Sequence, residues 1–244
     1  MASNTVPRGG ISNEQARLIE VLPRSADDLA LVALPGFTPQ QLRARFARNA
    51  EWLPEMLGDG QNDEWQLADS DYRQAAVLVP LVVRASGLTV LLTERNATMN
   101  AHAGQVSFPG GRRDPTDTSL THTALREAEE EIGLHATHCE VLGVLPPYLT
   151  ISRFKATPVV ALVHPPFELS PNPAEVADVF EVPLEFLTNP AHHQRRAREF
   201  MGKLRHFYAM PYAQSDGQER FIWGATAAML RNFYHFLRAG YPGS

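Results

Sequence analysis

Three glutamates, Glu127, Glu130 and Glu131, have the residue type and the spacing of a metal site. Since an α-helix turns by about 100° per residue, a helix through them places all three within an arc of about 100°, with Glu129 outside it. Like charges at this spacing repel, and Arg126 reaches Glu130 only from the side. A hard divalent cation such as Mg²⁺ or Mn²⁺ relieves the repulsion, because it prefers carboxylate oxygens. The cluster predicts a metal site, and the alternative is the solvated face of a glutamate-rich helix.

A helix and a loop must position these glutamates. We predict the helix over residues 118–132, with Gly133 as its C-cap. Its apolar flank, expected to pack on a core, consists of Ala124, Leu125, Ala128 and Ile132. Gly110 and Gly111 in the preceding loop let the backbone approach a phosphate or a metal, because glycine has no Cβ; a plain turn is the alternative. For Asp117 we favour a role as helix cap over one in the metal shell.

Composition sets the class of protein in which these residues act. The chain has 244 residues, of which 44% are hydrophobic and 20% charged, as in an ordinary globular protein. Its net charge of -5 argues against nucleic acid as a partner. The single cysteine, Cys139, excludes an internal disulfide and is expected to pack as a small apolar residue. Residues 1–10 lack the apolar core of a signal peptide, and no run reaches the ~18 apolar residues of a membrane span, so we expect a cytoplasmic protein without a membrane partner.

The pattern along the chain changes near residue 70. Residues 1–70 show no strand-like alternation and are predicted to be a partly helical extension, in which Pro39 begins a helix. Residues 71–244 are predicted to be the domain that carries the chemistry. Strands that alternate with two or three helices predict an α/β (mixed α+β) architecture, in which helices cover both faces of a mixed sheet.

A hairpin is expected at the start of this domain. Apolar runs at 75–83 and 88–93 predict its two strands, and Pro80 predicts an edge position or a bulge in the first. Residues 104–111 are expected to form a loop with one short extended segment. Further strands are predicted at 139–145, 157–164 and 204–210, and helices at 183–187 (short) and 225–237. Two loops are also predicted. One is proline-rich, at 165–176, and the other is exposed and polar, with His192, His193, Arg195 and Arg196.

The glutamate helix and its loop resemble the Nudix box, in which a loop, a helix and a loop hold divalent metal over a diphosphate. The core Arg-Glu-x-x-Glu-Glu-x-Gly is intact at residues 126–133. Asp117 stands where the usual box has a glutamate, six residues after Gly111, and its distance to Arg126 is one residue longer than usual. The resemblance covers roughly residues 75–240. It implies the Nudix fold, with a mixed sheet sandwiched between helices, and hydrolysis that depends on Mg²⁺ or Mn²⁺.

A second segment is similar to that of the coenzyme A pyrophosphatases within the Nudix superfamily. Leu-Leu-Thr-Glu-Arg at residues 91–95 is followed by His-Ala-Gly-Gln at 102–105 and Phe-Pro-Gly-Gly at 108–111. The chain departs from that pattern at Asn96, where the family prefers Ser or Ala, and at Asn100, where it prefers Arg. The resemblance implies that this arginine contacts a substrate phosphate, and Asn100 cannot supply that charge.

The resemblance and the residue types together suggest individual roles. Arg126 is expected to hold a carboxylate in its metal-binding rotamer through a charge-assisted hydrogen bond, and an ordinary surface pair with Glu130 is the alternative. Some Nudix enzymes recruit a base from a later loop, and of Glu175 and Glu168 we choose Glu175. Candidates for binding substrate are Arg95, His102, Gly110, Gly111 and Arg112, with Arg113 and Lys155 as further basic candidates; an ordinary surface role is the alternative for each charged one.

These observations predict hydrolysis of coenzyme A or its thioesters at the diphosphate. The expected products are 3′,5′-ADP and 4′-phosphopantetheine, or its acylated form. One rival keeps the chemistry and changes the substrate to ADP-ribose or another nucleoside diphosphate derivative. A second rival is a Nudix fold that binds without catalysis, against which the intact Glu127, Glu130 and Glu131 argue. A small diphosphate is the expected partner, and a homodimer is an open alternative.

Overall fold

The computed structural model describes residues 11–48, 51–56, 58, 71–96, 104–200, 202–239 and 241. Its helices are α1 (Asn13–Leu18), α2 (Ala26–Leu29), α3 (Pro39–Ala47), α4 (Leu120–Ile132), α5 (Leu184–Leu187) and α6 (Gly224–Arg238), with short 3₁₀ turns at Ala136–His138 and Pro190–His192. Its strands are β1 (Arg73–Arg84), β2 (Gly87–Arg95), β3 (Val106–Ser107), β4 (Gly110–Arg112), β5 (Cys139–Val144), β6 (Tyr148–Leu149), β7 (Phe154–Val163), β8 (Val176–Pro183), β9 (Gln194–Phe200), β10 (Lys203–Ala213) and β11 (Glu219–Trp223).

A large mixed sheet forms the middle of the molecule. Its main path runs β3-β2-β1-β7-β5, and β4, β6 and β8 pair at its sides. The predicted hairpin is confirmed as the antiparallel pair β1 and β2, while β1 and β7 run parallel over ten residue pairs. The predicted strands at 139–145 and 157–164 are confirmed as β5 and β7. Residues 104–111 contain two short strand segments, β3 and the start of β4, where one was expected.

The placement predicted for Pro80 is wrong, because β1 is a central strand. Pro80 is aligned with Ala161 of β7 on one side. On the other side, the pairing of β1 with β4 ends at Val77, and its pairing with β2 begins at Leu81. A proline lacks the N–H that a ladder needs, and here it lies in the interval between two successive partner strands, where no ladder hydrogen bond is lost.

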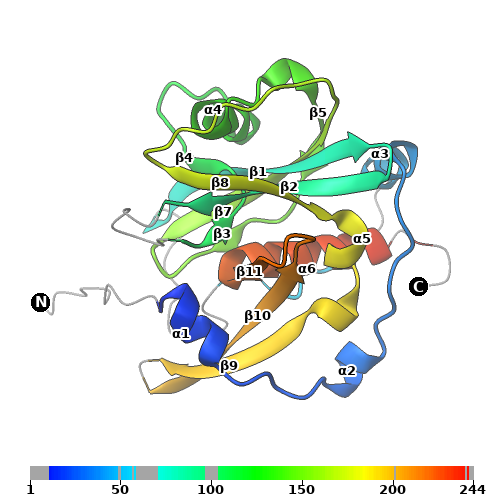
Figure 1. Cartoon of the computed structure of the whole chain (residues 1–244), viewed down its shortest axis with the longest axis vertical. Coiled ribbons are helices and arrows are strands. Elements are labelled where there is room, and N and C mark those ends of the chain that lie inside the picture. The colour runs from blue at the N-terminus through cyan, green and yellow to red at the C-terminus, as the bar shows by residue number, and fades with distance from the viewer. Residues whose placement is uncertain are drawn as a thin grey trace, which may run out of the picture.

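Helices cover both faces of the large sheet, which confirms the predicted architecture (Figure 1). On one face α4 packs through buried apolar residues, among them Ala124, Ala128 and Ile132, against β1, β7 and β8. On the other face lies α6, whose Phe233, Tyr234 and Leu237 are buried in the larger core. The predicted helix at 225–237 and the short one at 183–187 are thus confirmed as α6 and α5.

A second, three-stranded sheet in the order β11-β10-β9 packs on α6 from the side opposite the large sheet (Figure 1). It includes the predicted strand at 204–210 as part of β10. The exposed polar loop expected at residues 192–196 is wrong in part, because His193 is 5% exposed and Arg196 is 6% exposed. Arg196, on β9, donates to the backbone oxygens of Ala16, Arg17 and Ile19 at the end of α1. These acceptors lie about 180 residues away in sequence, so local composition did not reveal them.

The described part of the N-terminal region lies against this framework. The helix predicted at Pro39 is confirmed as α3, and Thr38 and Gln41 form its capping box. The side chains of Leu34, Leu42 and Met56 belong to the same core as α6. Whether residues 1–70 behave as a separate extension stays a prediction.

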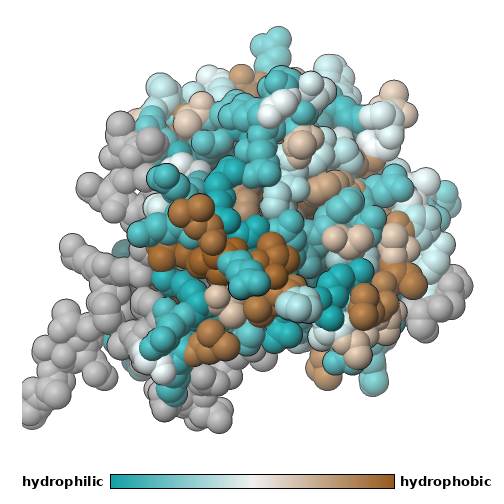
Figure 2. Space-filling view, turned by 60° about the horizontal axis from the view of Figure 1, so that its bottom comes forward, coloured by the Kyte–Doolittle hydropathy of each residue, from teal (hydrophilic) through white to brown (hydrophobic). Residues whose placement is uncertain are grey.

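The surface on the side of the small sheet carries exposed apolar residues. Figure 2, which brings the bottom of Figure 1 forward, shows hydrophobic residues gathered near the middle of this face. Leu18 of α1 is 82% exposed and Leu204 of β10 is 64% exposed. Within the described residues, no helix combines the length and the apolar character that a membrane crossing requires.

Candidate active site

Helix α4 carries the acidic cluster. It starts at Leu120, two residues later than predicted, because the Ser119 side chain caps it by accepting from the His122 N–H at 3.1 Å. It ends as predicted at Gly133, which has the left-handed conformation (φ 70°) that a C-cap requires and that glycine adopts without strain. The apolar flank of α4 is fixed to the sheet, so the positions of its glutamates follow from the helical spacing.

The three glutamates differ in burial, although they share one arc of the helix. Glu131 is buried at 5% exposure, and Glu127 is half-buried. Glu130 is exposed, with 60% of its side chain accessible to solvent. The gradient arises because Glu131 stands beside the buried Ile132 and faces strand β4, a contact that helical periodicity alone does not show.

Strand β4 brings the two glycines of the loop against α4. The Gly110 N–H donates to Glu131 Oε2 at 3.1 Å. A Cβ on Gly110 would lie 2.5 Å from the backbone oxygen of Ala76 in β1, and a Cβ on Gly111 would lie 2.5 Å from Glu127 Oε2. Gly110 is therefore required by its close approach to the backbone of β1, while at Gly111 an added side chain would displace the Glu127 carboxylate.

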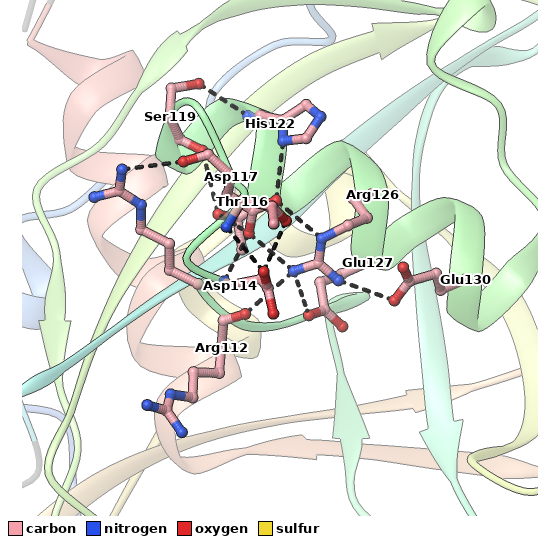
Figure 3. Close-up of polar contacts among 11 residues, drawn as sticks. Arg112, Asp114, Thr116, Asp117, Ser119, His122, Arg126, Glu127 and Glu130 are labelled. Atoms are coloured by element: carbon pink, nitrogen blue, oxygen red, sulfur yellow. Dashed lines mark hydrogen bonds and ion pairs between the residues drawn. The ribbon is translucent and has the colours of Figure 1, made fainter.

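Arg126 joins the loop to the helix (Figure 3). Its Nε and Nη2 donate to the two carboxylate oxygens of Asp117, each at 2.9 Å. Nη2 also lies 2.9 Å from Glu127 Oε1, and Nη1 donates to Glu130 Oε2 at 2.9 Å. One guanidinium thus contacts three carboxylates, and a bidentate pair of this kind fixes its orientation.

The capping role favoured for Asp117 is wrong. Ser119 takes that position, while Asp117 is buried and accepts hydrogen bonds from Arg126, from the Thr123 hydroxyl and from the Asp114 N–H. The Arg126 guanidinium holds the pKa of the Asp117 carboxyl well below its usual range, and Asp117 in turn raises the pKa of Arg126. Asp117 anchors the base of the loop and does not end the helix.

Burial dominates the electrostatics of the acidic cluster. It raises the pKa of Glu131 to about 7, against the opposing effects of the Gly110 hydrogen bond and the Arg95 charge. It also raises the pKa of Glu127, although Arg126 acts in the opposite direction. The charge of Glu175 adds to the rise at both residues. The fold therefore keeps these carboxylates close enough to oppose one another's ionisation.

The loop predicted at residues 165–176 is found at residues 164–175, and it brings Glu175 to this cluster. The Asn172 N–H donates to the Glu131 backbone oxygen at 2.8 Å, and the Asn172 side-chain amide donates to Glu175 Oε1 at 3.3 Å. The Asn96 N–H in turn donates to the Glu175 backbone oxygen at 2.8 Å. Sequence reasoning missed Asn172, because an asparagine in a proline-rich loop carries no sign of its distant partner. Glu168 lies exposed in the same loop.

The basic residues named as candidates are spread around this arrangement. Arg95, at the end of β2, places Nη1 4.0 Å from Glu131 Oε1. Arg112 is exposed at the end of β4, and its backbone oxygen accepts from Arg126 Nη2 at 3.2 Å. Arg113 donates to the Asp117 backbone oxygen, and Lys155 is half-buried on β7. His102 and Asn100 lie outside the described residues.

The donor set of the cluster fits a divalent cation. Its oxygens belong to carboxylates on successive turns of α4, and burial and mutual repulsion destabilise the ionised forms of Glu127 and Glu131, an effect that a cation offsets. Among the residues that the structure describes, no three acidic, histidine or cysteine side chains are already gathered into a metal site. Glu130, bound to Arg126, would have to turn from the guanidinium to join the other two.

Comparison with known proteins identifies the family. The model of the NUDIX domain matches residues 72–204, which is more than half of the chain. The chain therefore belongs to the Nudix family, and it is a Nudix pyrophosphohydrolase. Enzymes of this family act on small diphosphates and in general use divalent cations.

Bacterial relatives resemble the chain over most of their length. An uncharacterized Nudix hydrolase, NudL, of Pectobacterium atrosepticum is 43% identical over 158 residues, which are 65% of this chain and 79% of that protein. NudL of Yersinia enterocolitica is 44% identical over 158 residues, 64% of this chain and 77% of that protein. The crystal structure of RenU, a Nudix hydrolase from M. smegmatis, aligns with a TM-score of 0.40 and 27% identity over 46% of this chain and 71% of that one.

Proposed function

We propose that the chain hydrolyses the diphosphate of coenzyme A or its thioesters to 3′,5′-ADP and 4′-phosphopantetheine or its acylated form. The segment that resembles coenzyme A pyrophosphatases supports this proposal, because its two ends meet different oxygens of the same carboxylate. Arg95 approaches Glu131 from β2, and Gly110 binds Glu131 from β4. We also expect the enzyme to work in the cytoplasm.

Glu127, Glu130 and Glu131 would hold Mg²⁺ or Mn²⁺. The bound cation would supply charge neutralisation at the diphosphate oxygens and a more acidic water. Glu131 is held for this task by the Gly110 N–H, and Glu127 by Arg126. Since little covalent chemistry is required of the protein in phosphoryl transfer, positioning and charge account for most of the catalysis.

Glu175 is our candidate for the general base. It would take one proton from the attacking water, whose oxygen forms the new bond to phosphorus as the bridging P–O bond breaks. The other phosphate leaves with the bridging oxygen. Asn172 would fix the orientation of Glu175 for this step, since its amide donates to Oε1 at 3.3 Å.

The substrate phosphates would be bound by charge and by backbone donors. Arg95 is half-buried beside the acidic cluster, and it is our main candidate for a phosphate contact. Arg112 is exposed near Arg126 and could bind a phosphate further from the reaction. We retain His102 as a candidate on the basis of the sequence alone.

Product analysis tests this proposal. The protein is incubated with coenzyme A and, separately, with ADP-ribose, each with and without Mg²⁺ or Mn²⁺. Metal-dependent 3′,5′-ADP from coenzyme A, with little turnover of ADP-ribose, is expected. If only ADP-ribose is hydrolysed, giving AMP, coenzyme A would be the wrong substrate, but diphosphate hydrolysis would remain the reaction. No product from either, or from a wider diphosphate panel, would favour a binding module.

The metal role of Glu130 has its own test. Glu130→Gln should lower kcat at least about 100-fold, because the amide is a poor ligand for a hard cation. The free energy of unfolding should stay within about 0.5 kcal/mol of wild type, because the side chain is largely exposed. Glu129→Gln is the matched control: Glu129 lies outside the arc, and its Oε1 is 2.9 Å from His135 Nδ1. Equal rates in the two variants would remove Glu130 from the metal shell.

A further inference from the structure

Helix α1 contacts the chain just before β3, beside Arg95 at the end of β2. Asn13, its first residue, accepts a hydrogen bond from Trp223 Nε1 at 2.6 Å through Oδ1. Its Nδ2 donates to the backbone oxygen of Gly104. The two partners lie 210 and 91 residues away in sequence, so one amide side chain joins three distant parts of the chain.

Backbone hydrogen bonds link Gly104 and its neighbour Gln105 to Arg95. The Gly104 N–H donates to the Arg95 backbone oxygen, and the Arg95 N–H donates to the backbone oxygen of Gln105, both at 3.0 Å. Gly104 has a φ of 67°, a left-handed conformation in which a side chain would be strained. The backbone of Arg95 is therefore held by the segment whose position Asn13 fixes.

The position of the Arg95 backbone determines where its guanidinium lies relative to the acidic cluster. Its guanidinium Nη1 lies 4.0 Å from Glu131 Oε1. A shift of the Arg95 backbone would move the guanidinium relative to the acidic cluster, and misplacement of about 1 Å can be felt strongly in catalysis. The contacts thus run from Asn13 to Gly104, from Gly104 to Arg95, and from Arg95 to Glu131.

We propose that Asn13 is a positioning residue for Arg95, and that α1 helps to shape the phosphate-binding side of the active site. Helix α1 lies outside residues 72–204, the part of the chain that matches the NUDIX domain. The proposal rests on the proposed function, in which Arg95 binds a substrate phosphate. It assigns a role in substrate binding to a residue before the Nudix domain.

Asn13→Asp isolates this contact. An aspartate keeps the acceptor for Trp223 Nε1 but replaces the donor to Gly104 with a carboxylate oxygen, which a carbonyl oxygen repels. An acidic residue in the first turn also suits the helix dipole, so α1 itself should remain folded. Glu14→Gln is the matched control, because Glu14 is the next residue of α1 and is exposed.

The experiment measures KM and kcat for coenzyme A, or for ADP-ribose if that is the substrate, in a double-mutant cycle of Asn13→Asp with Arg95→Ala. Asn13→Asp should raise KM about three- to tenfold with a smaller change in kcat, and Glu14→Gln should change neither. In the Arg95→Ala background, Asn13→Asp should have almost no further effect on KM. Equal effects of Asn13→Asp in both backgrounds would overturn the proposal, because Asn13 would then not act through Arg95.

A second measurement separates this proposal from the proposed function. The affinity for inorganic pyrophosphate in the presence of Mg²⁺ is measured by calorimetry for the four proteins of the cycle: wild type, Asn13→Asp, Arg95→Ala and the double variant. If wild type hydrolyses neither substrate, the proposed reaction fails, while weaker pyrophosphate binding in Asn13→Asp that disappears with Arg95→Ala still supports the positioning role. Pyrophosphate binding that is unchanged by Asn13→Asp would refute it.

Discussion

At the scale of single residues, Glu131 shows how the fold opposes the charge that the proposed chemistry requires. The side chain is buried, its Oε2 accepts one backbone N–H, and the Arg95 guanidinium lies 4.0 Å from its carboxylate. Burial raises its pKa to about 7, from an ordinary value of 4.5. The ionised form is thus destabilised in the folded state until a cation joins it.

This predicts an unusual pH dependence of stability. Between pH 4.5 and about 7 the folded state binds more protons at Glu131 than the unfolded state, so this residue lowers the free energy of unfolding as pH rises through that window. Without metal, Glu131→Gln should be more stable than wild type by on the order of 2 kcal/mol at pH 8, and should show no gain below pH 4.5. Urea unfolding at both pH values measures the difference.

Metal should reverse the effect at Glu131. Mg²⁺ is expected to stabilise wild type at pH 8 and to have a much smaller effect on Glu131→Gln, because binding to the folded state adds to its stability. Glu130→Gln is the matched control without metal, since Glu130 lies in the same cluster but its side chain is largely exposed. Wild type and Glu131→Gln with identical unfolding curves at pH 8 would contradict the assignment of Glu131 as a destabilised, buried carboxylate.

At the scale of elements, the pair of Asp117 and Arg126 connects the loop after β4 to helix α4 (Figure 3). Arg126 then contacts Glu127 and Glu130 with its remaining donors. The orientation of two glutamates therefore depends on a buried carboxylate that would not itself touch metal or substrate.

Asp117→Asn should weaken this connection. The amide cannot reproduce the bidentate ion pair, so kcat should fall about 10- to 100-fold, as is typical when a partner that orients metal ligands is lost. The variant should also need more Mn²⁺ for half-maximal activity. Asp114→Asn is the control, because Asp114 is exposed and its carboxylate accepts from Thr116. If Asp117→Asn retains wild-type activity and wild-type Mn²⁺ dependence, Arg126 does not orient the glutamates.

The elements also show what the sequence could predict. Helix α4 was predictable because Ala124, Ala128 and Ile132 repeat at helical spacing and Gly133 ends it. Strand β8 was missed because Asp178 and Glu181 interrupt its apolar pattern, and their partners lie on other strands: Asp178 pairs with Arg220 of β11, and Glu181 with Arg84 of β1. Strand β9 was missed for a similar reason, since the buried Arg196 donates to carbonyl groups of the distant helix α1.

The arrangement of the candidate site was predictable to a similar degree. The grouping of the glutamates on one arc of α4 followed from their spacing, but their order of burial did not, because it depends on β4 lying against α4. Asp117 was misassigned because Ser119, two residues later, competes for the same cap. Asn13 and Asn172 are hydrogen-bonded to backbone oxygens of distant segments, and such contacts leave no local pattern in a single sequence.

At the scale of the whole molecule, a buried ionic network ties the N-terminal region to α6 and the small sheet. Arg231 of α6, which is 3% exposed, donates to Asp28 Oδ1 and to Glu55 Oε2, each at 2.7 Å. Its Nη1 also donates to His193 Nδ1 at 3.2 Å, and burial lowers the pKa of His193 to about 3, so this imidazole is neutral. The network places three parts of the chain around one guanidinium.

The carboxylates of this network set its pH dependence. Burial would raise the pKa of Glu55, but hydrogen bonds from His235, Tyr208 and Arg231 outweigh it and lower the pKa to about 2. Burial likewise opposes a lowered pKa at Asp28, where Ser25 and Arg231 prevail. Because both pKa values are depressed on folding, the stability that these groups contribute is present at neutral pH and is lost as pH falls from the ordinary carboxyl range toward 2.

Arg231→Met should therefore destabilise the whole molecule rather than the active site. Removing one partner leaves the buried Asp28 without its cation, and the expected loss is on the order of 3 kcal/mol in the free energy of unfolding at pH 7. The loss should shrink at pH 4, where the carboxyls of the variant become protonated. The double variant with Asp28→Asn should recover part of it at pH 7, because the unpaired charge is gone. A loss that is the same at pH 4 and pH 7, with no recovery in the double variant, would mean that packing of the Arg231 side chain, and not its charge, holds the N-terminal region to α6.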